Sequence, residues 1–292
     1  MELTIAAVAC AGSGVICGIP VQRMREDIIT ELDLSNSGIH VAAAMLVAYL
    51  FPATLVLKNC NLLNNSLNVE SATMLAKIGA EKGIMLSGMA RNQTGANLSG
   101  QNPADTILIV SDLQFMPVLT SLDLRLNHIG DEGAKAIAEA LKVNPVLTIL
   151  RLDGNGIGDD GAKAIAEALK VNPVLNNLDL RFNSIGDDGA KAIAEALKVN
   201  PVLTILDLGD NKNIGANGAK AIAEALKVNP VLTNLNLRYN EIRDNGAKAI
   251  AEALKVNQVL TNLDLEYNNL GYAGQKAVRD AVKDRSGFEL QL

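Results

Sequence analysis

One sequence feature limits the possible folds more than any other: the string GAKAIAEALKVN occurs five times in this chain of 292 residues. The copies begin at Gly133, Gly161, Gly189, Gly218 and Gly246, at intervals of 28, 28, 29 and 28 residues. Self-similarity at a period of this length indicates a stack of short units, each packing only on its neighbours. The sequence therefore predicts an elongated repeat array.

Each copy follows a strand-like segment with the spelling L-x-x-L-x-L-x-x-N-x-I/L. Alternation in Leu122-Asp123-Leu124 directs both leucines inward and the aspartate outward, as in a strand buried on one face. Asn127 follows at the turn, where its amide can bond backbone groups and reach the next coil. The same asparagine recurs at Asn155, Asn183, Asn211, Asn240 and Asn268.

The repeated string itself predicts an amphipathic helix, which begins after a short acidic turn and ends at Asn144-Pro145. Its apolar face carries Ala134, Ile137, Ala138 and Leu141. Its polar face carries Lys135, Glu139 and Lys142. Parallel strands stack about 4.8 Å apart, whereas packed helices need roughly 8–10 Å. The strands must therefore line the inside of an arc and the helices the outside.

Over Pro117 to Leu270 these motifs resemble the ribonuclease-inhibitor-like class of leucine-rich repeats, also found in nucleotide-binding immune receptors and Ran GTPase-activating proteins. The resemblance implies an α/β solenoid, a right-handed horseshoe with a parallel sheet on the concave face and helices on the convex face. It also implies binding of proteins through the concave strand face. Unlike the receptors, the chain has no G-x-x-x-x-G-K-[ST] nucleotide-binding loop.

Outside the regular repeats the pattern weakens. Leu32-x-Leu34 and Leu55-x-Leu57-x-x-Cys60 are interpreted as repeat strands, with Cys60 at the asparagine position and helices over 40–50 and 69–82. Ile84 to Leu86 suggests another strand, yet 94–98 lies in repeat register too, so 88–94 is either an insertion or a malformed coil. The expected division is an apolar cap over 1–28, irregular repeats over 29–116, regular repeats over 117–284 and a capping strand over 285–292. We expect one continuous sheet from about Ile29 to Leu292.

The fourth regular repeat has one additional residue between Gly209 and Ile214. We expect a bulged loop at Lys212-Asn213 that leaves the sheet register of Leu206 and Leu208 unchanged.

The uncharged segment from Leu3 to Gln22 has two interpretations. It is either a buried cap of the array or a signal peptide or membrane anchor, although Glu2 precedes it instead of a basic region. Three cysteines, Cys10, Cys17 and Cys60, are too few for a disulfide framework and favour a reducing compartment. The expected location is cytoplasmic, or secreted or membrane-anchored if residues 3–22 act as a signal or anchor.

The composition argues against several function classes. With 26 basic and 32 acidic residues the net charge is −6, which disfavours nucleic acid as a partner. His40 and His128 have no nucleophile or carboxylate at a defined spacing, so we expect no catalytic site and no enzyme activity. The Gly-Asp-Asp-Gly turns offer too few oxygens for calcium, so they are interpreted as helix caps, and no metal or cofactor is expected.

The outward strand positions vary from coil to coil while the helices are copied verbatim. Arginine and aromatic side chains carry much of the energy of protein interfaces, and arginine can bind partner carboxylates with two hydrogen bonds. The alternative is that these positions form only a solvated surface. The candidate partner-binding residues are Asp123, Arg125, Arg151, Asp153, Asp179, Arg181, Phe182, Asp207, Arg238, Tyr239, Asp264, Glu266 and Tyr267.

The sequence thus predicts a monomeric, non-catalytic scaffold for an unidentified protein partner. One alternative is a GTPase activator of the Ran type, which a GTP-hydrolysis assay with Ran would detect. Another is an engineered consensus scaffold, against which the irregular first hundred residues argue.

Overall fold

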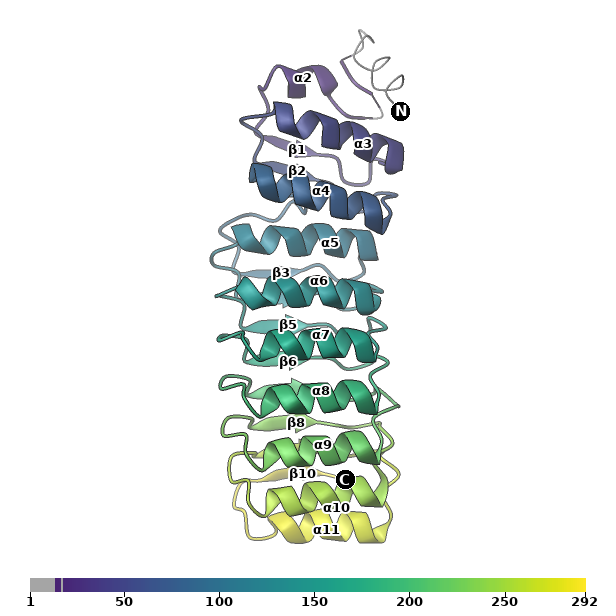
Figure 1. Ribbon diagram of the computed structural model, residues 1–292, viewed down its shortest axis with the longest axis vertical. Coiled ribbons are helices and arrows are strands. Elements are labelled where there is room, and N and C mark those ends of the chain that lie inside the picture. Colours follow the sequence, from purple (N-terminus) through teal and green to yellow (C-terminus); the bar gives the residue numbers. More distant parts are fainter. Residues whose placement is uncertain (1–13, 17) are drawn as a thin grey trace. The chain divides into compact units, whose positions relative to one another are not determined.

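The computed structural model describes residues 14–16 and 18–292 (Figure 1). Most of the uncharged segment from Leu3 onward, including Cys10 and Cys17, lies outside the described residues. The chain divides into two compact units. The first unit contains the chain up to Gln93 together with Gln101–Val118, and the second unit contains Thr94–Gly100 and Leu119–Leu292.

The second unit is an eight-stranded parallel sheet with six helices on one side of it (Figure 1). The strands follow one another in chain order from β3 to β10. They are β3 (Gly95–Asn97), β4 (Ser121–Asp123), β5 (Ile149–Arg151), β6 (Asn177–Asp179), β7 (Ile205–Asp207), β8 (Asn234–Asn236), β9 (Asn262–Asp264) and β10 (Glu289–Gln291). The helices are α6 (Gly130–Val143), α7 (Asp159–Leu169), α8 (Asp187–Leu197), α9 (Ala216–Leu226), α10 (Arg243–Leu254) and α11 (Tyr272–Val282). The predicted leucine-rich-repeat solenoid is confirmed.

The core of the second unit lies between the sheet and the helices, and the repeat spacing explains it. The inward strand residues Leu122 and Leu124 are buried, and so are Ile137 and Leu141 on the facing side of α6. Each coil adds the same small set of aliphatic side chains to the layer. Lys142 pairs with Glu139 at 2.5 Å on the opposite side of the helix, where both are exposed to solvent.

A column of buried asparagines joins the coils. Asn183 donates from Nδ2 to the carbonyl oxygens of Leu152 and Leu180, both at 3.0 Å. Its Oδ1 accepts the backbone N–H groups of Asn155 at 3.1 Å and Ile157 at 2.9 Å. These bonds satisfy backbone groups that the turn withdraws from the strands, and they cross from one coil to the next. The predicted asparagine column is confirmed.

A second buried column, which the sequence interpretation missed, lies where the helices end. Asn172 donates from Nδ2 to the carbonyl oxygen of Leu141 at 2.7 Å, in the last turn of the preceding helix. Its Oδ1 accepts the N–H groups of Val174 and Leu175 in the loop that follows. One side chain thus satisfies a helix-end carbonyl and shapes the return to the strand. The members are Asn144, Asn172, Asn200, Asn229 and Asn257.

The acidic turns do cap helices, but the capped helix belongs to the next coil. Asp131 Oδ1 accepts the N–H groups of Gly158 and Gly161, both at 2.8 Å, at the start of α7. Asp159 and Asp187 make the same bonds to the starts of α8 and α9. A carboxylate is favoured here because the free N–H groups of a helix start carry partial positive charge.

The extra residue of the fourth repeat is accommodated as predicted. Lys212 adopts a left-handed backbone conformation with φ of 61°, at the expected loop. Leu206 pairs with Leu178 and Leu235 on its two sides, so the sheet register is undisturbed.

The first unit contains α2 (Val21–Arg25), β1 (Glu31–Asp33), α3 (Val41–Leu50), β2 (Asn59–Asn61), α4 (Val69–Lys82) and α5 (Pro103–Asp112). Single 3-10 turns, η1 (Phe51–Ala53) and η2 (Leu113–Phe115), follow α3 and α5. Strands β1 and β2 form a parallel pair of their own. The helices expected over 40–50 and 69–82 are confirmed.

The prediction of one continuous sheet is wrong, because the strands form two sheets. Met85 forms a parallel bridge to Asn59 of β2, whereas β3 pairs with β4. Only turns and bends connect Leu86 to β3, so the coil that begins at Ile84 has no helix. Of the two interpretations of 88–94, the malformed coil is the one observed.

The interpretation of Cys60 is also wrong. Cys60 lies buried at the centre of β2, at the place that a leucine holds in the regular strands. Asn65 takes the asparagine role, since its Nδ2 donates to the carbonyl oxygens of Leu34 at 2.9 Å and Leu62 at 2.8 Å. A buried thiol behaves as a small hydrophobic side chain, which explains the substitution.

Candidate partner-binding face

The candidate site is the face of the second unit's sheet that turns away from the helices, here called the open face. It consists of the outward residues of β4 to β9 and the two residues that follow the leucine after each strand. Strand pairing sets Asp123 beside Arg151, and Arg151 beside Asp179. All thirteen sequence-predicted residues lie on this face or at its edge.

The aspartates at the ends of the strands hold the following turns. Asp179 Oδ1 accepts the backbone N–H of Arg181 at 3.0 Å, and Asp264 Oδ1 accepts that of Glu266 at 2.8 Å. Asp123 does the same for Arg125, and all three aspartates are buried. Each therefore has a structural task besides any role in binding.

The arginines of β4 and β6 are engaged by these aspartates. Arg125 Nη2 lies 2.8 Å from Asp123, and Arg181 Nη2 lies 2.7 Å from Asp179. Arg181 Nε also lies 3.2 Å from Asp207. The sequence expectation was two hydrogen bonds from each arginine to a partner's carboxylate; in the structure these guanidinium groups are already paired within the chain.

The coil of β5 has the two charges in the opposite order, and this produces pairs between coils. Arg151 Nη1 lies 3.8 Å from Asp123, and Asp153 lies 3.8 Å from Arg125. The inversion alternates the charges along the sheet, and ion pairs join the coil of β4 to that of β5. A separate set joins the coil of β6 to that of β7, through Arg181.

Several carboxyl groups on this face are hard to ionise. Burial raises the pKa of Asp207 to about 7, against the opposing effect of the hydrogen bond from the Gly209 N–H. Burial also raises the pKa of Asp153, with the negative charge of Asp179 adding to it. The same cause raises the pKa of Asp210 and Asp264. Burial therefore opposes a negative charge at all four positions.

The edge of the open face carries a column of residues in the left-handed backbone region. The column comprises Leu126, Gly154, Phe182, Asp210, Tyr239 and Tyr267, with φ between 50° and 71°. This region suits glycine, asparagine and aspartate and strains other residues. Four of the six nevertheless carry large apolar or aromatic side chains, and those of Leu126, Phe182 and Tyr267 are 63%, 56% and 58% exposed.

Two members of this column form an aromatic pair. The rings of Tyr239 and Tyr267 stack with centroids 4.2 Å apart and planes inclined by 8°. The guanidinium carbon of Arg238 lies 4.9 Å from both ring centroids. Its only ion pair among the described residues is with Glu266, at 3.8 Å. The arrangement presents a rigid aromatic surface that already holds one cation.

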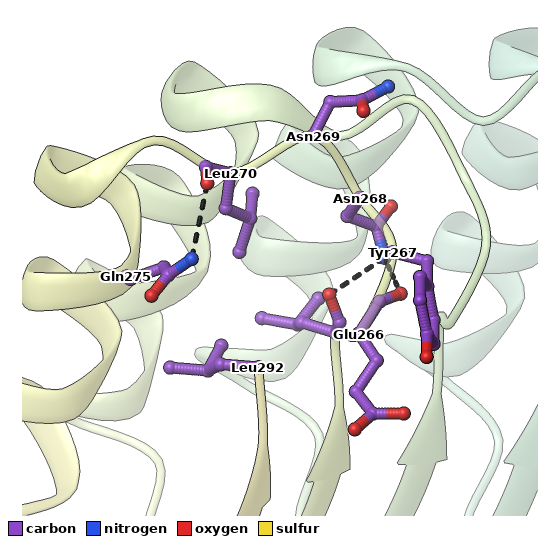
Figure 2. A pocket seen from close by; sticks show the side chains of 8 residues that line it. Glu266, Tyr267, Asn268, Asn269, Leu270, Gln275 and Leu292 are labelled. Atoms are coloured by element: carbon purple, nitrogen blue, oxygen red, sulfur yellow. Dashed lines mark hydrogen bonds between the residues drawn. The ribbon is translucent and has the colours of Figure 1, made fainter.

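A pocket of about 340 Å³ lies between the coil of β9 and the C-terminal residue Leu292 (Figure 2). Leu265, Glu266, Tyr267, Leu270, Gln275 and Leu292 are among its lining residues. The Nε2 amide of Gln275 donates to the carbonyl oxygen of Leu270 at 3.2 Å across one side of it (Figure 2). The pocket adjoins the aromatic pair at the end of the open face.

Leu126 and Asp210 belong to the exposed column, but sequence reasoning did not include them among the candidates. The signal was present, because both occupy the same repeat position as Phe182, Tyr239 and Tyr267. What could not be read from the sequence is the left-handed backbone at this position, which makes large side chains there unusual.

Other chemical features of the described residues are few. His40 and His128 are both exposed. Within residues 14–16 and 18–292, no three His, Cys, Asp or Glu side chains are grouped to hold a metal ion. None of the helices in this part of the chain has the length and apolar character needed to span a bilayer.

Comparison with known proteins supports the repeat assignment. The Leucine Rich repeat family model matches residues 116–138, 143–166, 171–194, 199–223, 228–251 and 256–278. No curated protein gives a match.

Three solved structures match parts of this chain. Leiomodin-1 actin-binding site 2 is 27% identical, with a TM-score of 0.44, and covers 50% of this chain and 85% of its own. The tropomodulin C-terminal domain of Caenorhabditis elegans is 14% identical, with a TM-score of 0.40, and covers 65% of this chain and 93% of its own. LegL7 of Legionella pneumophila is 22% identical, with a TM-score of 0.46, and covers 87% of this chain and 80% of its own.

Six matched repeats, each built from a strand, an asparagine turn and a helix, show the family. The chain belongs to the leucine-rich repeat proteins.

Proposed function

We propose that this chain is a non-catalytic scaffold that binds a protein partner on the open face of its sheet, the concave face of a horseshoe. The supporting observation is the edge column, where Leu126, Phe182, Tyr239 and Tyr267 hold large exposed side chains on left-handed backbone. Placing such residues there weakens the folded state without adding a buried core. A contact with another protein would bury these exposed side chains and so offset the cost of placing them on left-handed backbone.

The rest of the open face fits this role. The sheet is rigid, because both asparagine columns fix each coil to its neighbour. Side chains on a rigid surface lose little conformational entropy when a partner docks. Stacked tyrosines and paired arginines are the residue types that dominate protein interfaces.

The proposal includes the type of partner and the setting. The open face carries seven carboxylates against four guanidinium groups, so nucleic acid would be repelled. We propose that the chain acts as a monomer in the cytoplasm. The buried free thiol of Cys60, whose pKa is raised by burial, is compatible with a reducing compartment.

The test compares captured partners by affinity purification and mass spectrometry. The baits are the wild-type chain, a face variant with Phe182→Asn and Tyr239→Asn, and a helix-side variant with Lys135→Ala and Glu139→Ala. Asparagine suits the left-handed backbone, so the face variant is expected to fold. We expect partners that the wild type and helix-side variant retain and the face variant loses. Equal recovery by all three baits would contradict the proposal.

A further inference from the structure

The charges of the open face are unevenly distributed between its two halves. The open-face positions of the β4 to β6 coils hold three aspartates and three arginines: Asp123, Asp153, Asp179, Arg125, Arg151 and Arg181. The open-face positions of the β7 to β9 coils hold four carboxyl groups and one arginine, Asp207, Asp210, Asp264, Glu266 and Arg238, with Lys212 in the loop beside them. The first half has as many carboxyl groups as arginines, and the second half has three more carboxyl groups than arginines. Burial raises the pKa of Asp207 to about 7, so the acidic character of the second half depends most on the other three.

The excess carboxylates have few partners within the chain. Asp207 is engaged by Arg181 and by the Nδ2 amide of Asn236, at 3.0 Å. Among the described residues the Asp210 carboxyl group makes no close ion pair, although the charges of Arg238, Lys212 and Arg181 act on it and oppose the effect of burial on its pKa. Glu266 has only the 3.8 Å pair with Arg238, which is longer than a hydrogen bond.

The aromatic pair lies in the same half of the face. Tyr239 and Tyr267 flank Arg238 in the chain's last coils, and the Tyr267 side chain is more than half exposed. The guanidinium carbon of Arg238 is equally far from both ring centroids, so this group lies beside the stacked pair. Exposed tyrosine beside uncompensated carboxylates favours a cation, because ring and carboxylate attract it together.

We propose that the β7 to β9 half of the open face receives a basic segment of the protein partner. A lysine or arginine side chain of that segment packs on Tyr267 and pairs with Glu266 and Asp210. This inference rests on the proposed scaffold function and adds the chemistry of the partner. An acidic partner is disfavoured because this half of the face has four carboxyl groups and one arginine, while the arginines of the other half are already paired.

The experiment titrates the full chain with two probes of equal length, alternating glycine-lysine and glycine-glutamate peptides. The readouts are affinity and the NMR signals of the Tyr239 and Tyr267 rings. We expect binding of the lysine peptide with shifts of both rings, and no comparable binding of the glutamate peptide. Equal or tighter binding of the glutamate peptide would overturn the proposal.

Matched variants separate a local site from the general attraction of an acidic chain for a basic peptide. The site variant carries Asp210→Asn and Glu266→Gln, and the control carries Glu139→Gln and Glu167→Gln, so their net charges are equal. We expect the site variant to weaken lysine-peptide binding roughly tenfold, or about 1.4 kcal/mol, and the control to change it little. Equal weakening in both variants would contradict a local site.

This inference and the scaffold function can fail separately. If partner capture requires Phe182 and Tyr239 but tolerates Asp210→Asn with Glu266→Gln, the scaffold function stands and the basic segment is wrong. If the lysine peptide binds the site but no captured partner depends on the open face, the proposed function fails instead.

Discussion

The Oδ1 atom of Asn155 lies 2.7 Å from the backbone nitrogen of Asn127, 28 residues earlier in the chain. The Nδ2 atom of Asn155 donates to the carbonyl oxygen of Leu124 in that same earlier coil, at 2.9 Å. One side chain therefore fixes the turn of its neighbour through both a donor and an acceptor. Repeated along the array, this relationship makes each strand depend on the coil that follows it.

The first prediction concerns this column. Asn183→Ala removes three donated and two accepted hydrogen bonds from a buried turn. Unpaired buried backbone groups cost about 1–3 kcal/mol each, so we expect the free energy of unfolding to fall by about 3 kcal/mol. Chemical denaturation measures it. The control is the exposed neighbour Ser184→Ala, and a loss no larger than that of the control would refute a structural role for Asn183.

The second prediction concerns the cap between helices. Asp159→Ala removes the acceptor for the N–H groups of Gly186 and Gly189, both buried at the start of α8. A lost helix cap costs about 1 kcal/mol, and we expect a loss of that size in thermal unfolding. The neighbouring exposed Asp160→Ala provides the control.

The chain contains a natural comparison for this cap. Ala216 stands where four other coils have aspartate, namely Asp131, Asp159, Asp187 and Asp244. The next helix then begins with Arg243 in a left-handed conformation, φ 55°. Asp244 restores the pattern by accepting from Gly271 at 2.8 Å. Ala216→Asp together with Arg243→Gly should therefore raise the unfolding midpoint. A lower midpoint would show that the aspartate cap does not explain the geometry.

The third prediction is a pH dependence. The pKa of Asp207 is raised to about 7, so the folded chain holds a proton that the unfolded chain has lost over much of the acid range. Its contribution to stability is full below the ordinary carboxyl pKa and is lost as the pH rises towards 7. Asp112, buried and accepting the Leu86 N–H, behaves in the same way with a pKa of about 6. The melting temperature should therefore rise when the pH is lowered from 8 to about 5.5.

Asp207→Asn isolates the contribution of this group. Asparagine occupies the same position in the next coil, where Asn236 Oδ1 accepts the N–H of Arg238 at 2.9 Å, so the turn is retained. We expect the variant to be more stable than the wild type at pH 8, by about 1–3 kcal/mol, and this difference to shrink steadily as the pH is lowered from 7 to about 4. A variant less stable than the wild type at pH 8 would contradict a burial cost for the charged group.

Much of the fold could be predicted because the same sequence pattern recurs in every regular coil. Six copies of the strand motif determine which leucines face inward, and the helices follow from their apolar spacing. The interpretation was wrong where copies are few. Cys60 was assigned to the asparagine position because Leu55 suited an earlier strand register, and only the hydrogen bonds of Asn65 distinguish the two alignments.

The candidate site could be predicted only in part. Repeat position placed the residues on one face, but it could not show that Arg181 is held by Asp179 and Asp207. Side-chain pairing across coils depends on distances between strands that the sequence does not contain. The left-handed backbone at Phe182 could not be predicted from the sequence either. Aspartate, glycine and tyrosine share that column, so no single residue type marks the backbone conformation there.

The fourth prediction addresses this backbone. Phe182→Asn replaces an exposed ring at φ 52° with a residue that tolerates the left-handed region. We expect the free energy of unfolding of the variant to equal that of the wild type or to exceed it by up to about 1 kcal/mol. We expect its affinity for the partner to fall. Denaturation and binding are measured on the same preparation. A loss of stability beyond about 1 kcal/mol would mean that the ring supports the fold instead.

The most direct test of the account is the affinity of a captured partner for two double variants. Arg181→Ala with Tyr239→Ala alters the open face, and Lys135→Ala with Glu139→Ala alters the exposed side of α6. Titration calorimetry on variants shown to be folded by circular dichroism should give a dissociation constant roughly tenfold higher or more for the first, and nearly unchanged for the second. The opposite ranking would move the binding site to the helices and contradict the account.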